Sequence, residues 1–256
     1  MLRSKLIGPA DMERKKTALV TGSATGIGRS TAWQLAERGY QVVVNYSRSE
    51  ADAEETAAGV RDRGAEVLVV KANVGNDDEI RAMIDKAVGH FGGIDVLVNN
   101  AGTTHFIAHT DLEAVTEQVW NDILNVNVKG LFSCCRAAMP HLKKRHGNIV
   151  NVASVAGLAG SGSSIPYAAS KGAVITLTKS LARAFAPEVR INAVAPGPVQ
   201  TRWLADHQDM VESAMTLTPM KRPSSPDDIA DAIVFLADVS TLMTGQVVVI
   251  DGGRTM

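Results

Sequence analysis

The sequence TALVTGSATGIGRS, residues 17–30, determines the fold that we expect for this chain. Its first four residues are apolar or β-branched without alternation, which is typical of a strand covered on both faces. Glycines follow at positions 22, 26 and 28, and residues 27–38 carry apolar side chains at the spacing of a helix. The stretch therefore predicts a buried strand, a tight turn and a helix, in that order.

Strand and helix patterns alternate in the same way along the rest of the chain. Such alternation predicts a parallel sheet with right-handed crossovers and helices on both faces. No linker or repeat divides the sequence, so we expect one doubly wound α/β domain of about seven strands at residues 16–256, after a flexible lead-in at residues 1–15. The expected strands are residues 17–21, 41–46, 66–71, 95–99, 148–153, 190–195 and 246–250.

The composition excludes several kinds of partner. The 26 Lys and Arg residues balance 27 Asp and Glu residues, and no basic run is long enough to follow a nucleic-acid backbone. No apolar run reaches the roughly 18 residues of a membrane span, and the N-terminus lacks the apolar core of a secretory signal. Cys134 and Cys135 are adjacent and fit neither a disulfide nor a zinc site. We expect a soluble, cytoplasmic protein without a metal, membrane or nucleic-acid partner.

The glycine turn has the properties of a dinucleotide-binding loop. Glycines let the chain turn tightly and approach a pyrophosphate, and the N-terminus of the following helix offers free N–H groups. The turn lacks the Lys-Ser/Thr ending of an NTP-hydrolysing loop, so phosphoryl transfer is disfavoured. The residues expected at the cofactor are Gly22, Ser23, Thr25, Gly26, Ile27 and Gly28.

Tyr167 and Lys171 lie four residues apart, on one face of a helix predicted to begin at Pro166. An unperturbed tyrosine has a pKa of about 10, and a nearby ammonium would lower it, so that the phenol could exchange a proton with a substrate oxygen near neutral pH. A surface Tyr–Lys pair would have the same spacing. Ser154 adds weight to the catalytic interpretation, because it follows the strand at residues 148–153 at the edge where open α/β sheets bind ligands.

Other residues after the predicted strands belong to the same edge. Two asparagines, Asn125 and Asn127, lie inside the helix predicted at residues 125–144, where asparagine is a poor helix former. A functional role is therefore expected for one of them, and periodicity does not choose between the two. The residues expected to contact the cofactor from the fourth and sixth strands are Asn99, Ala101 and Gly102, and Pro196, Gly197, Val199 and Thr201.

The turn Thr-Gly-x-x-x-Gly-x-Gly, together with Ser154 and the Tyr167-x-x-x-Lys171 pair, resembles the short-chain dehydrogenase/reductase family. The resemblance extends over residues 16–253 and is greatest to the 3-oxoacyl-carrier-protein reductase-like members. It implies a Rossmann-type fold and a nicotinamide cofactor. It also implies a catalytic tetrad of Asn127, Ser154, Tyr167 and Lys171, with Asn127 preferred over Asn125 because it follows Trp120 by the family's seven residues.

The roles within the tetrad follow from the same resemblance. Tyr167 would be the acid/base, and Ser154 would orient the substrate. Lys171 would hold the nicotinamide ribose and tune the tyrosine, and Asn127 would support a water-mediated proton relay. The expected activity is reduction of a ketone or 3-oxoacyl group to an alcohol by hydride transfer.

The end of the second strand favours NADP(H) over NAD(H). An acidic residue there would bind the adenosine ribose and repel a 2′-phosphate, but the first carboxylate after the strand is Glu50, and Tyr46 stands where NAD-preferring relatives carry Asp. Arg48 and Ser47 could donate charge-assisted hydrogen bonds to the phosphate. Asn73 and Val74, at the end of the third strand, are expected at the adenine.

Two other functions remain open at this point. One is an NAD-dependent dehydrogenase of a sugar, polyol or hydroxysteroid, and the other is a non-catalytic dinucleotide sensor. The substrate pocket is expected around residues 103–106, 155–165 and 203–220, and His105 is more often a bystander than a ligand. The strand at residues 246–250 is apolar on successive positions, as a fully covered strand would be, yet it closes the sheet at one edge, which favours association between chains. The family resemblance implies a homotetramer, with a dimer as the alternative.

Overall fold

The structure, a computed structural model, describes residues 14–204 and 208–256. Apart from Arg14 and Lys15, the expected lead-in at residues 1–15 lies outside the described residues. The seven strands of the described residues form one parallel sheet, as the sequence predicts, and their order in it is β3-β2-β1-β4-β5-β6-β7. The strands are β1 (Thr17–Val20), β2 (Gln41–Tyr46), β3 (Val67–Lys71), β4 (Val96–Asn99), β5 (Asn148–Val152), β6 (Arg190–Pro196) and β7 (Val247–Ile250).

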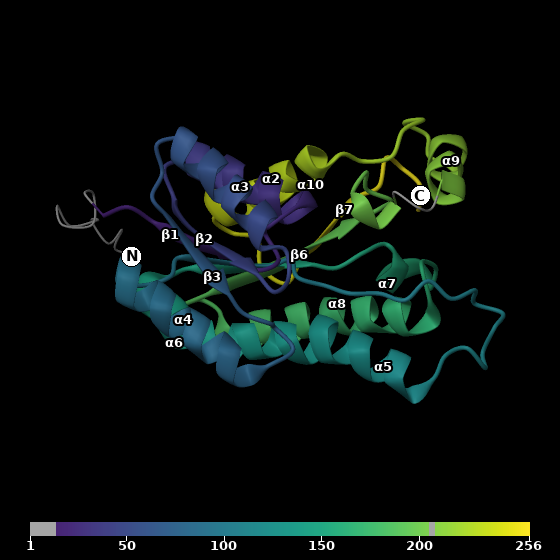
Figure 1. Cartoon of the computed structure of the whole chain (residues 1–256), viewed down its shortest axis with the longest axis horizontal. Coiled ribbons are helices and arrows are strands. Elements are labelled where there is room, and N and C mark those ends of the chain that lie inside the picture. The colour runs from purple at the N-terminus through teal and green to yellow at the C-terminus, as the bar shows by residue number, and fades with distance from the viewer. Residues whose placement is uncertain (1–13, 205–207) are drawn as a thin grey trace, which may run out of the picture.

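Helices cover both faces of the sheet, which lies between them as the middle layer (Figure 1). Each face has its own apolar core. One core joins the sheet to α4, α6 and α8, and the other joins it to α2, α3 and α10. The helices are α2 (Gly26–Glu37), α3 (Glu50–Asp62), α4 (Asp77–Phe91), α5 (Glu117–Leu124), α6 (Leu131–Arg145), α7 (Ala156–Ala159), α8 (Ile165–Phe185), α9 (Gln208–Leu217) and α10 (Pro226–Val234), with the short turns η1 (Asn125–Gly130), η2 (Arg202–Leu204) and η3 (Phe235–Val239).

The central strands are buried because they have helices on both faces. β1, β4 and β5 are buried along their whole length, as expected from their unbroken apolar character. The expectation that residues 246–250 form a fully covered strand is wrong for the single chain. β7 pairs only with β6, so it is an edge strand, and Val249 is 42% exposed.

The helix predicted at residues 125–144 is divided. Its first part is the π-helical turn η1, and the α-helical part α6 begins only at Leu131. Two contacts occur at this turn: the Asn125 Nδ2 atom donates to the Gly75 carbonyl at 3.1 Å, and Gly130 packs against the Val74 carbonyl so closely that a Cβ there would overlap it. π-Helical turns are frequent at functional sites.

The order of the strands determines where a ligand can enter. β1 pairs with β2 on one side and with β4 on the other, so the connections diverge between β1 and β4. Such a point leaves a crevice outside the carboxyl ends of the strands. Within residues 14–204 and 208–256, no helix is both long and apolar enough to cross a membrane, and no cluster of three metal-ligating side chains occurs.

Candidate active site

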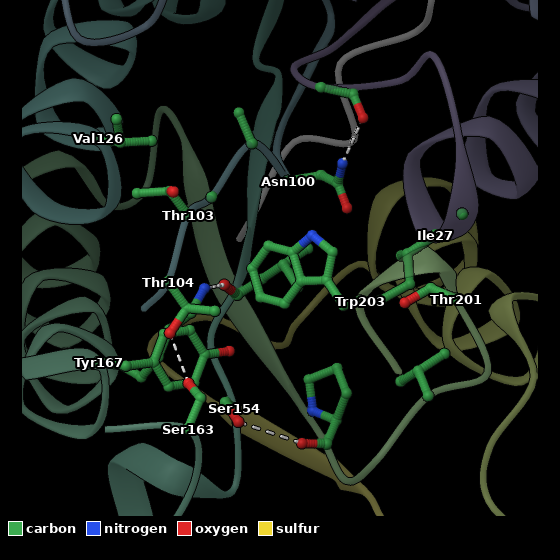
Figure 2. Close-up of a pocket in the computed structure, with 18 of the residues that line it drawn as sticks. Ile27, Asn100, Thr103, Thr104, Val126, Ser154, Ser163, Tyr167, Thr201 and Trp203 are labelled. Atoms are coloured by element: carbon green, nitrogen blue, oxygen red, sulfur yellow. Dashed lines mark hydrogen bonds between the residues drawn. The ribbon is translucent and has the colours of Figure 1, made fainter. Parts of the chain in front are cut away.

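A large cavity of about 1410 Å³ lies at the carboxyl ends of the strands. Figure 2 shows some of the residues that line it. It extends from the glycine turn to α8 and brings together segments that are distant in the sequence. Most of the residues predicted for the site line this cavity. These are Gly22, Thr25, Gly26, Ile27, Tyr46, Ser47, Arg48, Asn73, Val74, Ala101, Gly102, Ser154, Tyr167, Lys171, Pro196, Gly197, Val199 and Thr201.

The glycine turn is shaped for a close approach. Gly22 and Gly26 have positive φ angles of 60° and 56°, and a Cβ at Gly22 would lie 2.9 Å from the Ala101 Cα atom. No side chain caps the N-terminus of α2, where Thr25 is the capping residue, so the first N–H groups of the helix have no side-chain acceptor. The turn therefore fits the pyrophosphate of a dinucleotide, because it combines space next to the backbone with free amide donors.

Three of the predicted cofactor residues do not line the cavity. Ser23 is fully buried, and its hydroxyl donates to the Val20 carbonyl at 2.8 Å. Asn99 points into the core, where it donates to the Asn151 Oδ1 atom on the neighbouring strand at 2.9 Å. Gly28 lies behind the turn, and a Cβ there would be 2.6 Å from the Gly22 carbonyl oxygen. These residues shape the turn from inside, and the motif did not distinguish this role from direct contact.

Two asparagines that the prediction omitted line the cavity and hold the turn. The Asn45 Oδ1 atom accepts from the Gly22 N–H at 3.0 Å, and the Asn100 Nδ2 atom donates to the carbonyls of Thr21 and Gly22, both at 2.9 Å. The signal for Asn45 was available in the sequence. A polar residue inside an otherwise apolar, doubly covered strand requires a buried partner.

Tyr167 lies in the first turn of α8, next to the cavity. The helix begins here because the buried Ser164 hydroxyl accepts from the Tyr167 N–H at 3.4 Å and Pro166 favours the first turn. Lys171 follows one turn later and is 5% exposed. Its ammonium donates to the Val152 carbonyl at 2.8 Å and lies 5.7 Å from the centroid of the tyrosine ring.

Ser154 lies on the other side of the tyrosine. Its hydroxyl accepts from the Ala156 N–H at 3.1 Å and lies 3.5 Å from the Pro196 carbonyl (Figure 2). A hydrogen bond between Ser154 and Tyr167 also contributes to the pKa of the phenol. A substrate oxygen that enters the cavity between these two residues would meet two hydroxyl groups at once.

The electrostatics of this pair differ from the expectation. Burial raises the pKa of Tyr167 to about 12, and the hydrogen bond from Ser154 only partly opposes this. Burial also lowers the pKa of Lys171 to about 8. The expected lowering of the tyrosine pKa by the lysine is therefore wrong for this structure, because desolvation dominates and the ammonium is directed to the Val152 carbonyl.

Asn127 does not line the cavity. It is 1% exposed, and its side chain holds the backbone of Thr103 by accepting from the N–H at 2.8 Å and donating to the carbonyl at 3.0 Å. It also donates to the Ser170 hydroxyl at 3.1 Å. Asn125, the alternative, does line the cavity. The geometry thus gives Asn127 a positioning role between a cavity loop and α8.

The ends of β2 and β3 form the part of the cavity farthest along the sheet from Tyr167. Tyr46 is 7% exposed, and burial together with a hydrogen bond to Glu50 raises its pKa. The exposed Arg48 lines the cavity and has no ion pair within the described residues. The Asn73 Oδ1 atom accepts from the Gly75 N–H at 2.9 Å, so it shapes the loop after β3.

The opposite end has the residues expected for a substrate pocket. Residues 103–106 all line it, and the predicted segments 155–165 and 203–220 contribute in part, although residues 205–207 lie outside the described residues. The Thr104 and Ser163 hydroxyls are 2.5 Å apart (Figure 2). His105 lines the cavity and lies 3.1 Å from the Asp122 carboxylate. Arg202 and Arg254, which the prediction omitted, also line it.

Comparison with known proteins agrees with this geometry. A family model described as enoyl-(acyl carrier protein) reductase matches residues 22–255. A Streptomyces violaceoruber protein, assigned as ketoacyl reductase 2 of the granaticin polyketide synthase, is 45% identical over 95% of this chain and 97% of its own length.

Two further matches cover nearly the whole chain. The 3-oxoacyl-(acyl-carrier-protein) reductase of Staphylococcus aureus is 42% identical over 96% of this chain and 100% of its own length. A Burkholderia xenovorans structure assigned as a short-chain dehydrogenase/reductase superposes with a TM-score of 0.89 and 38% identity, covering 94% of this chain and 98% of that one. The chain is therefore a member of the short-chain dehydrogenase/reductase family, an NAD(P)-dependent oxidoreductase.

Proposed function

We propose that this enzyme uses NADPH to reduce the ketone of a 3-oxoacyl or related substrate to an alcohol, with Tyr167 as the proton donor. The names of its relatives support the substrate class, since two of them are ketoacyl reductases that match it over nearly their full length. Under this proposal, the bound cofactor supplies a hydride to the carbonyl carbon.

The observation that carries the proposal is the position of the Tyr167 phenol beside Ser154 in the cavity (Figure 2). With a pKa of about 12, Tyr167 keeps its proton at neutral pH and can donate it to a carbonyl oxygen that is gaining negative charge. Ser154 would orient that oxygen by a second hydrogen bond. The ketoacyl reductases among its relatives favour a reductase over the alternative NAD-dependent dehydrogenase.

Lys171 and Asn127, both buried, would support proton donation by Tyr167. The buried lysine lies beside the tyrosine ring and lines the same cavity, so its ammonium would bind the nicotinamide ribose and hold the cofactor next to Tyr167. Asn127 would hold the loop at Thr103 against Ser170 of α8, and any proton relay would depend on that alignment. A sensor that only binds the dinucleotide has no use for the Ser154–Tyr167 pair.

The preference for NADPH rests on the end of β2. Arg48 and Ser47 line the cavity where the adenosine ribose would lie, and no carboxylate replaces Tyr46 to bind a free 2′-hydroxyl. Arg48 would donate charge-assisted hydrogen bonds to the 2′-phosphate. Asn73 and Val74 would lie at the adenine.

The test compares two kinds of thioester. Purified enzyme with NADPH is expected to reduce acetoacetyl-CoA and to leave crotonyl-CoA unchanged, with NADPH consumption followed by absorbance. Crotonyl-CoA is an enoyl thioester: it has a carbon–carbon double bond next to the thioester and no 3-oxo group. It is the kind of substrate that the description of the family model, an enoyl reductase, names. Turnover of crotonyl-CoA alone would replace the proposed ketone reduction with enoyl reduction. Turnover with NADH but not NADPH would reverse the cofactor assignment.

We also infer that residues 16–256 act as a single domain in a cytoplasmic homotetramer. The half-exposed edge strand β7 supports the assembly, because long apolar edges are normally paired or covered. Light scattering coupled to size exclusion is expected to give four times the 27.1 kDa chain mass. A mass of 27.1 kDa at micromolar concentration would exclude both the tetramer and the dimer.

A further inference from the structure

A bidentate ion pair lies at the cavity and joins two segments that are 150 residues apart. The Arg202 guanidinium donates to both carboxylate oxygens of Asp52, at 2.7 and 2.5 Å. Asp52 belongs to the first turn of α3, immediately after the Ser47–Ser49 segment that lines the cavity. Arg202 also lines the cavity, although no sequence motif points to it as a site residue.

The short segment that carries Arg202 lies across the cavity. On one side, the Thr201 methyl group lies 3.2 Å from the position of a Cβ at Gly26, in the glycine turn. On the other side, the Trp203 indole packs edge to face with the Tyr167 ring, with 6.2 Å between centroids. Figure 2 shows the indole projecting into the cavity between these two sides. The segment therefore spans the binding site from the turn to the catalytic tyrosine.

The Arg202 guanidinium is available for a second partner. Its side chain is 67% exposed, although the ion pair is bidentate. Asp52 does not depend on it alone, because the Arg29 guanidinium lies 3.7 Å from the same carboxylate and is 17% exposed. Arg29 is itself anchored by the Ala24 carbonyl and the Thr56 hydroxyl, at 3.0 and 2.9 Å. The carboxylate therefore keeps a cation beside it when Arg202 leaves.

We propose that Arg202 is a further cofactor-binding residue, which exchanges Asp52 for a phosphate of the dinucleotide. This inference deepens the proposed function, since it names a residue for the cofactor of the same site. The guanidinium fork that binds two carboxylate oxygens also fits two phosphate oxygens. Asp52 then has the opposite effect to Arg202, because it competes for the guanidinium and repels the incoming phosphate.

The competing explanation is that the ion pair only ties α3 to the segment at residues 201–204. Under that explanation, loss of either partner has the same effect on cofactor binding, because either change breaks the tie. Under the proposal, the two changes differ. Arg202→Ala weakens binding, whereas Asp52→Asn leaves binding unchanged or makes it tighter.

The experiment is calorimetric titration of the full-length enzyme with NADP⁺, NAD⁺ and 2′,5′-ADP, which needs no turnover. The Arg202→Ala variant is expected to bind NADP⁺ about tenfold more weakly than the wild type, because it loses a bidentate charge-assisted contact. Arg202→Lys keeps the charge and recovers part of the affinity. Arg222→Ala removes another exposed bidentate ion pair, with Asp228, outside the cavity and should bind like the wild type.

The ligand series identifies which phosphate is bound. A loss with NADP⁺ and 2′,5′-ADP but not with NAD⁺ assigns the 2′-phosphate, and an equal loss with NADP⁺ and NAD⁺ assigns the diphosphate. Unchanged NADP⁺ binding by Arg202→Ala, or an Asp52→Asn variant weakened as much as Arg202→Ala, would overturn the proposal. Because these are binding measurements, an enzyme that bound cofactor normally but reduced no ketone would count against the proposed function only.

Discussion

Replacing Lys171 with methionine should make the protein more stable at neutral pH and abolish its reductase activity. The lysine is buried, and burial lowers its pKa from 10.5 to about 8. Because the unfolded chain binds this proton more tightly than the folded protein, protonation of Lys171 opposes folding. The cost is fully present below about pH 8, and it disappears as the pH rises towards 10.5, the unfolded value.

The magnitude follows from the same values. A pKa lowered from 10.5 to about 8 corresponds to about 3 kcal/mol of lost stability at pH 7. Methionine avoids this cost, but it also removes the hydrogen bond from the ammonium to the Val152 carbonyl, which offsets about 1 kcal/mol. We therefore expect Lys171→Met to raise the free energy of unfolding by about 2 kcal/mol at pH 7.

The assay is urea unfolding at equal protein concentration, at pH 7 and again near pH 10. The stabilisation should be present at pH 7 and should largely vanish near pH 10, where the wild-type lysine no longer carries the cost. Lys179→Met is the matched control, because Lys179 is an exposed residue of the same helix α8, and its replacement should change stability little at either pH. A Lys171→Met variant that is less stable than the wild type at pH 7, or equally stabilised at both pH values, would refute the reasoning.

Two further predictions concern the cofactor. Gly22→Ala should destabilise the fold by about 1–2 kcal/mol and weaken NADP⁺ binding, because residue 22 has a φ of 60° and its Cβ would press on Ala101. The control is Gly89→Ala, in helix α4 with nothing near its Cβ position, which should be neutral or slightly stabilising. Equal unfolding midpoints for the two variants would contradict this prediction. Tyr46→Asp should weaken NADPH far more than NADH in a fluorescence titration, with Tyr46→Phe close to wild type, and unchanged NADPH affinity would mean that the 2′-phosphate is bound elsewhere.

Much of the fold was predictable because local signals agreed with the final structure. Unbroken apolar runs marked the strands buried on both faces, and each observed strand begins and ends within one residue of its predicted bounds. β7 is the exception in burial rather than in position. Its apolar run resembles that of a central strand, so the sequence predicts a covered strand, whereas β7 has a partner on one side only, at the edge where it was expected.

The candidate site was predictable in outline but not in the direction of its side chains. A motif places Ser23, Asn99 and Asn127 near the cofactor, yet each points into the protein and supports its neighbours there. Asn127 lies in the π-helical turn η1, and α-helical periodicity does not predict the direction of a side chain in such a turn, because the turn contains an extra residue. Arg202 was missed because its partner Asp52 is 150 residues away, and no pattern in one sequence joins the two.

The direction of the tyrosine pKa shift was also beyond the sequence. The spacing of Tyr167 and Lys171 predicts a lysine close enough to lower the tyrosine pKa, but it contains no information about burial. In the fold, desolvation acts on both groups, raising one pKa and lowering the other.

The central claim, that Tyr167 donates the proton, is tested most directly by Tyr167→Phe. The ring would keep its contact with Trp203, so NADP⁺ affinity by titration should remain close to that of the wild type. The kcat for NADPH-dependent reduction of acetoacetyl-CoA should fall by about 10²–10⁴-fold, the usual contribution of a positioned acid. Normal NADP⁺ binding with kcat reduced by that factor is the predicted result. Retention of wild-type kcat would contradict the assignment of Tyr167 as the acid.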